Sequence, residues 1–508
     1  MVREGTYWWN AYYGSMQDHP GFRSLHEERA VSLDAAGDLP GWLRGSLVRN
    51  GPGSFSLPGG SAVDHWFDGL AMLSRFTFDP DGRAGNGDGD AVHYRNRFLR
   101  TETYRAAAAG EFEDGFATGE TTLRSRLAML LTAPYDNTNI AVERVGDDYV
   151  ALTESPRWVR VDPGTLETLG HAQYDGDAPA GQLTCAHLRR DPATGTLVNV
   201  ATEFGRESTY HVHAIPALGE RRHVGSVPTD EPAYMHSFAL TPRYVVLTEF
   251  PFRLDPLRFL RPGRQGPFVE QFEWQPDRGT RVVVLDRSTG DVVADPVTDA
   301  VFGFHHVNAY ERAGGRELVF DLETVPDATA IDSLYLDSLR AGNLATLAGR
   351  LERFVVHLGG ATGRDRYGTN PSVERETLYA DGTALPTASP ARWCRRHRYV
   401  YAMRMDQPVT EWATGVTKFD TETGRTVEFD DGAEYFGEPV FVPAPDGCRE
   451  GEDEGVVLTV GLDPGADRSR LFVLDGESLT ERARVTLPHA LPFDFHGRYF
   501  PELRARSA

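Results

Sequence analysis

Cysteine, lysine and long apolar runs are all scarce in this chain of 508 residues. The three cysteines, Cys185, Cys394 and Cys448, form no CxxC pair, so neither a disulfide scaffold nor a thiolate metal site is indicated. Their small number fits a reducing compartment. Cys185 lies two residues before His187, but we interpret it as a small buried strand residue and not as a ligand.

Positive charge is also scarce, since the formal net charge is −22 and Lys418 is the only lysine. This balance argues against nucleic-acid binding, because phosphate contacts need a basic surface. No segment reaches the roughly 18 to 20 unbroken apolar residues that span a bilayer. The N-terminal residues also lack the apolar core and cleavage site of a signal peptide. We therefore expect an intracellular, cytoplasmic protein.

The composition favours a large β-rich body. Hydrophobic residues make up 40% of the chain, and 52 glycines with 32 prolines indicate many turns. Large β-architectures often exceed the average domain length, so we expect one domain over residues 1–508. Five segments place an aspartate-led turn between two strand-like runs, a pattern typical of β-hairpins. Their turns begin at Asp162, Asp191, Asp286, Asp420 and Asp475. By themselves they predict an all-β protein, either a propeller or a sandwich.

Four histidines in strand-like surroundings are the strongest chemical signal. His187, His236, His305 and His496 are separated by 49, 69 and 191 residues. Local zinc motifs place ligands only a few residues apart, so only a fold that brings distant segments together could join these four. A radial propeller does so, because its inner strands meet near one axis. A single histidine is more often a surface or hydrogen-bonded core residue, so the hypothesis of one metal site depends on the whole set.

Several longer motifs accompany the histidines in a fixed order. They are "LPGWLRGSLVRNGPGSF" (39–55), "DHWFDGLAMLSRFTF" (64–78), "YDNTNIAVERVGDDYVALTES" (135–155), "FGEPVFVPAP" and "LPHALPFDFHGRYF". Together with the histidine segments they resemble the carotenoid cleavage oxygenase family, which includes stilbene-cleaving enzymes and the vertebrate retinoid isomerohydrolase. The resemblance spans nearly the whole chain. It implies a seven-bladed β-propeller, roofed on one face by loops and short helices, with Fe(II) bound by the four histidines.

The same resemblance implies residues around the metal ligands. Glu154 matches a glutamate that orients a ligating imidazole, and Thr138 matches a threonine that crowds the open coordination side. For the other two orienting glutamates, the alignment places Arg350, with Glu352 close by, and Ala384. If both glutamates are lost, as this placement implies, two ligands must be oriented by backbone carbonyls, water or another side chain, and full activity is in question.

Three further histidines, His306, His65 and His489, lie in or near these motifs. In "FHHVNAYE" only one of two successive strand residues can face the metal, and the family pattern selects His305, which leaves His306 as a packed or hydrogen-bonded neighbour. His65 and His489 lie in family motifs that resemble packing and turn elements, so we do not expect them to bind metal.

The implied activity is cleavage of a conjugated carbon–carbon double bond by dioxygen, which gives aldehyde or ketone products. "FHHVNAYE" resembles the animal type, so a carotene or apocarotenoid that yields retinal-like products is the first expectation. A stilbene-cleaving enzyme is an alternative, although the lysine that holds the phenol is absent unless Lys418 serves. A retinoid isomerohydrolase-like enzyme and a non-catalytic carotenoid-binding propeller also remain open.

Two segments are candidates for helices. Residues 328–354 have apolar residues at helical spacing and predict one or two helices of the roof. In residues 121–136, Arg124 and Arg126 precede the apolar side chains of Leu127, Met129, Leu130 and Leu131. This segment fits a patch that docks on a membrane at a tunnel mouth, and it fits a core helix equally well. Residues 250–274 could form a second part of such a patch.

Overall fold

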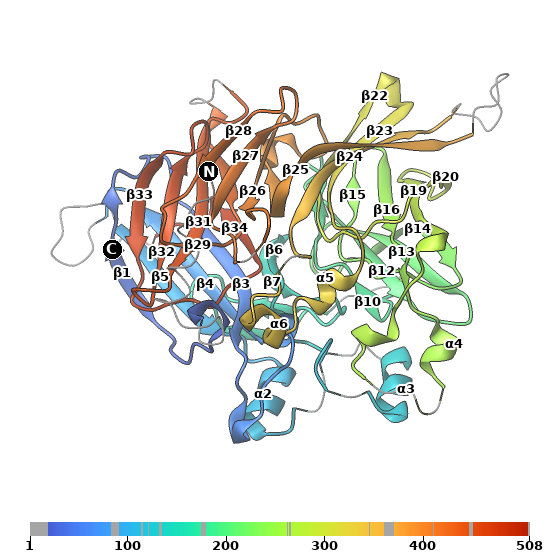
Figure 1. Ribbon diagram of the computed structural model, residues 1–508, viewed down its shortest axis with the longest axis horizontal. Helices are drawn as coiled ribbons and strands as arrows, with labels where there is room; N and C mark the ends of the chain where they lie inside the picture. Colours follow the sequence, from blue (N-terminus) through green and yellow to red (C-terminus); the bar gives the residue numbers. More distant parts are fainter. Residues whose placement is uncertain are drawn as a thin grey trace.

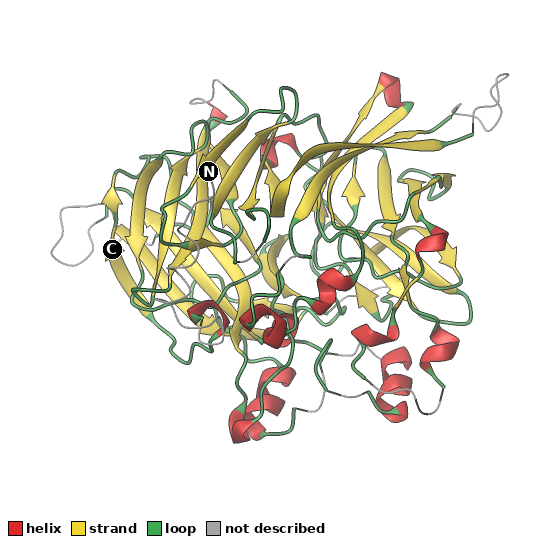
Figure 2. Cartoon of the chain, in the orientation of Figure 1, coloured by secondary structure: helices red, strands yellow, loops and turns green. Residues whose placement is uncertain are grey.

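The computed structural model describes residues 19–505 except 83–90, 113–114, 120, 132–134, 174–178, 262, 264–265, 345, 360–369, 410 and 447–450. The described chain is built almost entirely of strands, with a few short helices (Figure 2). The N-terminal residues 1–18 and Cys448 lie outside the described part. Within that part, no helix combines the length and the apolar character needed to cross a membrane.

The strands form several antiparallel sheets, in which neighbouring strands are hydrogen-bonded. The N-terminal sheet contains, from edge to edge, β1 (Ala30–Asp34), β5 (Ala91–Phe98), β4 (Leu70–Asp79), β3 (Ser46–Ser54) and β34 (His496–Phe500). The next contains β6 (Ala141–Val145), β7 (Asp148–Leu152), β8 (Val159–Val161) and β9 (Thr168–His171). A third contains β10 (Leu183–Thr184), β12 (Leu197–Glu203), β13 (Ser208–Ile215) and β14 (Arg222–Thr229), with β11 (Arg189–Arg190) beside β12.

The remaining sheets follow along the chain. One contains β15 (Ala239–Leu240), β16 (Tyr244–Glu249), β19 (Thr280–Asp286) and β20 (Val292–Ala294), with β21 (Val297–Thr298) beside β19. Another contains β2 (Ala36–Gly37), β33 (Glu481–Thr486), β32 (Arg468–Asp475), β31 (Gly455–Asp463) and β29 (Tyr435–Phe436), with β30 (Val440–Pro443) beside β31. A two-stranded ribbon pairs β17 (Phe252–Arg253) with β18 (Glu273–Trp274).

The largest sheet has seven strands and a long shared member. Its order is β22 (His306–Arg312), β23 (Glu317–Thr324), β24 (Gly349–His357), β25 (Ser372–Ala388), β26 (Tyr399–Arg404), β27 (Gly415–Asp420) and β28 (Thr426–Phe429). The first part of β25 pairs with β24, whereas its last residues, from Thr383 on, pair with β26. A register shift and the left-handed backbone of Leu385 (φ 49°) lie in this second part. The sheet is therefore two four-stranded units that share one strand.

The five aspartate-led turns are confirmed as hairpin connections. Each aspartate side chain accepts backbone N–H groups of its own turn, as Asp475 does from Glu477 and Ser478. The fifth turn residue takes the left-handed backbone that favours glycine, as Gly424 does at φ 71°. Leu479 takes the same conformation at φ 54° without being glycine. The turn therefore persists where the aspartate holds it, even without the glycine.

The N- and C-terminal parts of the described chain meet in one sheet. Strand β34 pairs antiparallel with β3, with Asn50 opposite His496. The fully buried guanidinium of Arg49 in β3 donates to the carboxylate of Asp494 at 2.6 Å and to the backbone carbonyl of Glu438 at 2.9 Å. Because a buried charge needs such partners, this contact fixes the place where the chain closes on itself.

The helices gather on one side of the sheets, at the bottom of Figure 1. They are α2 (Glu102–Ala109), α3 (Leu123–Leu131), α4 (Pro256–Phe259), α5 (Thr329–Asp332) and α6 (Leu336–Arg340). Residues 328–354 thus contain the two expected helices, but both are short, and the segment ends in strand β24. Arg126 of α3 is buried and donates to the carbonyl of Phe259 at 2.8 Å, which joins α3 to α4.

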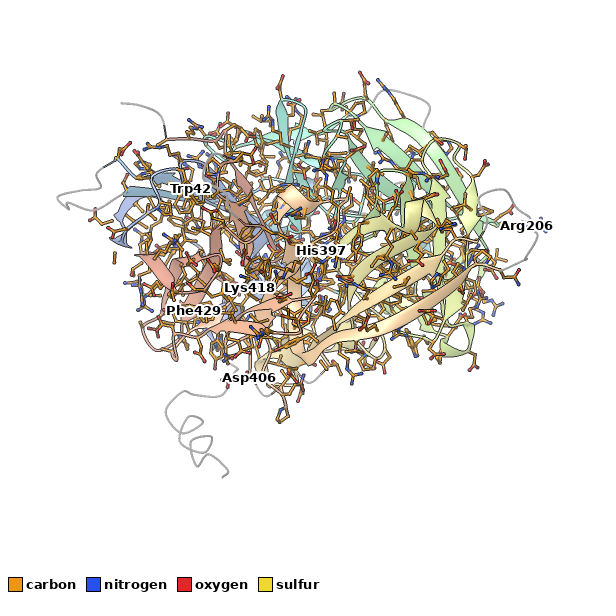
Figure 3. All side chains as sticks on the ribbon, turned by 90° about the horizontal axis from the view of Figure 1, so that it is seen from above. Trp42, Arg206, His397, Asp406, Lys418 and Phe429 are labelled. Atoms are coloured by element: carbon orange, nitrogen blue, oxygen red, sulfur yellow. The ribbon has the colours of Figure 1, made fainter. Side chains whose placement is uncertain are left out.

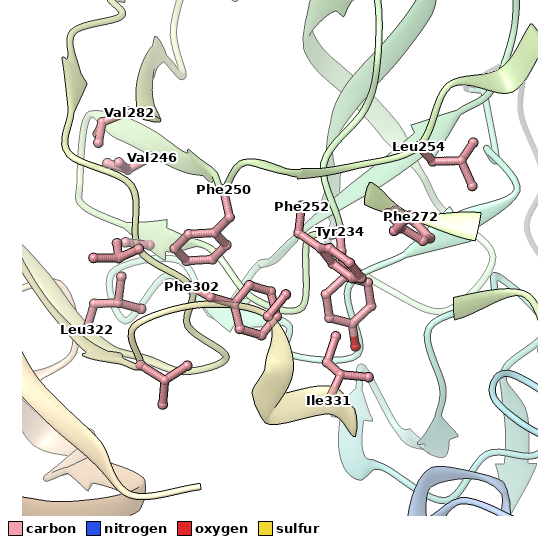
Figure 4. Packing of buried hydrophobic residues seen from close by; sticks show 14 of the residues in the cluster. Tyr234, Val246, Phe250, Phe252, Leu254, Phe272, Val282, Phe302, Leu322 and Ile331 are labelled. Atoms are coloured by element: carbon pink, nitrogen blue, oxygen red, sulfur yellow. The ribbon is translucent and has the colours of Figure 1, made fainter. Parts of the chain in front are cut away.

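A large aromatic cluster packs beneath these helices. Figure 4 shows Phe250, Phe252, Phe302 and Tyr234 next to one another, with Ile331 of α5 beside them. The rings of Tyr234 and Phe302 stack at a centroid distance of 6.2 Å. Buried aromatic side chains of this kind contribute strongly to core stability, so the cluster is a rigid support for its neighbours.

Candidate metal centre

The four predicted histidines lie beside the edge strands of four sheets. His187 lies between β10 and β11, His236 lies shortly before β15, His305 directly precedes β22, and His496 is the first residue of β34. Strands β10, β15, β22 and β34 each end the order of their own sheet. Edge strands of different sheets lie next to one another, as β15 does with β22. The sheet arrangement therefore brings residues that are distant in sequence to one point.

At that point the imidazoles converge. One ring nitrogen from each of the four histidines lies within 4.8 Å of the nitrogens of the others. The Nε2 atoms of His187 and His236 are 2.9 Å apart. Ring centroids are 4.4 Å apart for His187 and His496 and 5.0 Å apart for His305 and His496. This group can bind a metal ion.

Three of the imidazoles are held by carboxylates on the side that faces away from the cluster. The Nδ1 atom of His236 donates to Glu154 at 2.6 Å, that of His305 to Glu323 at 2.9 Å, and that of His496 to Glu438 at 2.8 Å. A carboxylate at Nδ1 fixes the tautomer and leaves the Nε2 lone pair free for a metal. His187 has no such carboxylate among the described residues.

The expected loss of two orienting glutamates is wrong. Glu323, at the end of β23, and Glu438, just before β30, occupy these roles instead of Arg350 and Ala384. Glu352 bonds to Thr324 and Arg375 and contacts no ligand histidine. Glu438 lies in "FGEPVFVPAP", which the sequence analysis used only as a family marker. Glu323 was recoverable from strand pairing, because its backbone N–H donates to the carbonyl of His305.

Of the adjacent pair, His305 faces the centre and His306 does not. Both ring nitrogens of His306 are occupied, Nδ1 by the hydroxyl of Ser237 and Nε2 by that of Thr248, each at 2.8 Å. The Nε2 atom of His305 is buried and has no hydrogen-bond partner. The interpretation of His306 as a hydrogen-bonded core residue is confirmed.

Burial sets the charge state of this region. It lowers the pKa of His187 and of His305 well below the usual value, and the neighbouring imidazoles of the cluster lower both further. Burial also raises the pKa of Glu323 to about 8. A cation among the histidines would favour the ionised form of this carboxyl. The lowered pKa values favour neutral imidazoles at His187 and His305, which is the form that binds metal.

The residues present fit a first-row transition metal. The donor set is four neutral imidazoles, a choice that suits iron, copper, nickel and zinc alike. The Nε2 atom of His305 supports a bound metal most directly, because it is buried and has no hydrogen-bond partner among the described residues. Such an atom is costly unless a ligand satisfies it. The carboxylates behind three rings complete the arrangement.

An apolar cavity of about 80 Å³ borders the centre. Three of the ligand histidines, His236, His305 and His496, line it. The indole N–H groups of its two tryptophans are already used, by Trp66 for the carbonyl of Phe493 and by Trp412 for that of Phe436, each at 3.1 Å. The other lining side chains are Phe67, Ile140, Phe304, Glu323, Leu334, Leu347, Ala384, Leu385, Met403, Met405 and Phe495. The cavity therefore suits a hydrocarbon.

A tyrosine that the sequence analysis missed stands behind one carboxylate. The hydroxyl of Tyr234 donates to Glu154 at 2.8 Å and lies 3.2 Å from Nδ1 of His236. Its ring is packed in the aromatic cluster (Figure 4). The segment "YMH" could have indicated this tyrosine, because Tyr234 lies two residues before His236 and residues two apart in an extended segment share a face.

The remaining candidates have other surroundings. Thr138 is fully buried and its hydroxyl has no partner among the described residues. His65 accepts the N–H of Phe67 and contacts the carbonyl of Ile331, while His489 pairs with the hydroxyl of Tyr94, so both are packing residues as expected. The thiol of Cys185 donates to the carbonyl of Met235.

Lys418 is engaged elsewhere. Its ammonium donates to Asp453 at 2.5 Å and to the carbonyl of Glu477 at 2.9 Å. It is not among the residues that line the apolar cavity, and Figure 3 shows it on the far side of His397 from Arg206. A lysine for binding a phenol is therefore missing from the cavity wall.

Comparisons with known proteins agree with this geometry. Residues 22–501 match the family model described as retinal pigment epithelial membrane protein. A chicken protein named β,β-carotene 15,15'-dioxygenase is 30% identical over 93% of this chain and 96% of its own. A Galleria mellonella protein named carotenoid isomerooxygenase is 32% identical over 94% and 96%. The crystal structure of cobalt-substituted Synechocystis ACO shares 25% identity with a TM-score of 0.80, covering 96% of this chain and 99% of that one.

Proposed function

The chain belongs to the carotenoid oxygenase family, and from this premise we propose that it cleaves a conjugated double bond of a carotenoid or apocarotenoid with dioxygen. One oxygen atom goes to each carbon of the broken bond, so two aldehyde or ketone products form and no external reductant is needed. The observation that carries the proposal is the convergence of four imidazoles, three of them supported by carboxylates, beside an apolar cavity. The relatives named above as carotene-cleaving enzymes support it.

We assign the metal as Fe(II), bound by His187, His236, His305 and His496. Iron bound there would supply the activation of dioxygen, for which open coordination positions are required. Glu154, Glu323 and Glu438 hold three rings with Nε2 facing the metal. Because all four ligands are neutral, the charge of the ion stays uncompensated within the ligand set.

The chain positions the substrate through shape and exclusion of water. The cavity wall offers aromatic and aliphatic surface and no free indole N–H, so a polyene can lie against it without loss of hydrogen bonds. Ala384 and Leu385 of β25 belong to this wall. Thr138, with its unpartnered hydroxyl, is assigned to crowd the open coordination side.

The proposed architecture is a single seven-bladed propeller over residues 1–508. Counting the seven-stranded sheet as two units, the described strands form seven groups of four or more. The pairing of β3 with β34 would close the ring. The helices on one side would be the roof (Figure 1).

Delivery of a nearly insoluble polyene points to a membrane-docking surface on this roof. Leu123 and Leu127 of α3 are 40% and 46% exposed, and Leu257 of α4 is 64% exposed. These three leucines form the candidate patch, since α3 and α4 are joined through Arg126. An apolar patch with basic neighbours favours binding at a bilayer surface, and Arg124 is exposed beside it.

The patch differs from the expected one. Arg126 and Met129 are buried and do not reach a membrane. The side chains of Leu130 and Leu131, which the expected patch included, lie outside the described part of the chain.

Leu123→Glu with Leu257→Glu should reduce liposome binding and cleavage of membrane-delivered carotene by several-fold, and should spare a detergent-solubilised apocarotenoid. Leu169→Glu, at a leucine of β9 that is 53% exposed, is the matched control. Equal liposome binding by the patch variant and the control would contradict the docking surface.

Oxygen uptake by the iron-loaded chain tests the activity. With β-carotene or an apocarotenal we expect one dioxygen consumed per bond broken and two carbonyl products, identified by mass. Iron binding without oxygen uptake would favour a carotenoid-binding protein. A retinyl ester converted to an isomerised alcohol without oxygen uptake would favour an isomerohydrolase, and uptake with a stilbene alone would favour the stilbene-cleaving alternative.

A further inference from the structure

A second group of histidines lies in the sheet formed by β10 to β14. His211 and His213 are on β13, two residues apart, and His223 is opposite His213 on β14. Residues two apart on a strand share a face, and so do cross-strand partners. The three ring centroids form a nearly equilateral triangle with sides of 6.0, 6.1 and 6.2 Å.

Hydrogen bonds converge on the space between two of these rings. The hydroxyl of Ser226 lies 2.9 Å from Nδ1 of His211 and 2.7 Å from Nε2 of His223. On its other side, Nε2 of His211 donates to Glu203 at 2.8 Å. This is the carboxylate–imidazole arrangement that orients a metal ligand, with Nδ1 of His211 as the nitrogen left for the metal.

The third ring is unsatisfied. His213 is 1% exposed, and its Nε2 atom has no hydrogen-bond partner. Buried polar atoms of native proteins are nearly always paired, and each exception calls for an explanation, such as a bound water or ion.

We propose that His211, His213 and His223 form a second metal site, which takes a divalent cation of the zinc type with Glu203 as the carboxylate behind His211. The cation would take the place of the Ser226 hydroxyl between the rings. Imidazole nitrogens lie about 2.1 Å from zinc. The three rings, whose centroids are 6.0 to 6.2 Å apart, would therefore have to move towards one another to bind it.

The position of the group allows an ion to enter. Strand β14 is the outer edge of its sheet, and His223 is exposed. The three histidines lie on β13 and β14, whereas His187 of the four-histidine centre lies beside β10, at the opposite edge of the same sheet. The site is therefore separate from the four-histidine centre and independent of the proposed cleavage reaction.

Zinc binding to the iron-loaded, full-length chain tests the proposal. Equilibrium dialysis with Zn²⁺ should show one more ion per chain in the wild type than in His223→Ala, because His223 is exposed and its loss spares the fold. Glu203→Gln should weaken zinc binding by about 10 to 100-fold. Carotenoid cleavage should be the same in wild type and His223→Ala.

His26→Ala is the matched control, since His26 lies on a different part of the chain, outside the histidine triangle, and it should bind zinc as the wild type does. Equal zinc content in wild type and His223→Ala would overturn the proposal, whether that content reflects exchange at the central site or no binding at all.

Discussion

The molecule contains two histidine clusters that are built in different ways. The central cluster draws its four members from segments beside the edge strands of four sheets. The outer cluster of His211, His213 and His223 comes from a single hairpin. Its ring centroids are 6.0 to 6.2 Å apart, against 4.4 to 5.2 Å between His187 and its three neighbours.

The difference shows what long-range assembly provides. Three central rings have their own carboxylate, and the carboxylate behind His236 is in turn held by Tyr234 from the aromatic core. The outer cluster has one carboxylate, Glu203, half exposed to solvent. A ligand set fixed by packing from several sheets is preorganised, whereas a set on one hairpin must adjust to the ion. We expect tight iron binding at the centre and weaker, exchangeable binding outside.

The largest effect should come from removing one central ligand. His305→Ala should abolish iron retention and cleavage. Water would fill the coordination position that His305 leaves vacant, and Glu323 would lose the imidazole that it supports. His306→Gln, on the neighbouring residue, should retain iron and lose mainly stability. Iron content by elemental analysis with the unfolding temperature separates the two, and equal loss of iron in both variants would break the assignment.

Removing the Arg49–Asp494 contact, which joins the N- and C-terminal parts of the described chain, should affect the two histidine clusters unequally. Arg49→Met leaves the partly buried Asp494 without its partner beside His496, and the loss of one partner from a fully buried pair costs about 3 to 5 kcal/mol, which is the upper bound here. Iron affinity should fall with it, while zinc binding at the outer cluster should not change.

Arg253→Met is the matched control, because it breaks a buried pair with Glu249 away from the closure. It should lower the unfolding temperature and leave the iron affinity of the folded protein unchanged. If Arg49→Met and Arg253→Met lose iron equally, the closure has no special role.

Weakening the carboxylates should have a smaller effect. Glu154→Gln, Glu323→Gln and Glu438→Gln should each lower iron affinity or turnover by about 10 to 100-fold, since the amide is a poorer acceptor for Nδ1–H. Glu352→Gln should leave both quantities near wild type, because Glu352 contacts Thr324 and Arg375. Unchanged iron content and turnover in all three variants would contradict a supporting role.

The parts of the molecule that could be read from the sequence are those with local signals. The aspartate-led hairpins were predicted because each turn is stabilised within a few residues, as at Asp475. The histidines were found through their motifs. Glu438 was missed because no local pattern records its contact with His496, which is 58 residues away in sequence. Glu323 was missed because its contact with His305 follows from the register of the β22–β23 hairpin and not from a motif.

Helix length and side-chain direction were also beyond the sequence. Apolar residues in 328–354 recur at helical spacing, but the last part of this segment forms strand β24, which pairs with β23 and β25. For residues 121–136 the sequence left a membrane patch and a core helix equally open, and Arg126 proves to be buried and bonded to the carbonyl of Phe259. Both outcomes follow from tertiary contacts that override local preference.

Anomalous diffraction from one crystal of the protein, loaded with iron and then soaked in zinc, tests the central claim most directly. At the iron edge we expect one peak, bound by the Nε2 atoms of His187, His236, His305 and His496 at about 2.1 Å. At the zinc edge we expect an additional peak between His211, His213 and His223. An iron peak elsewhere, or any of the four central imidazoles turned away from it, would contradict the account.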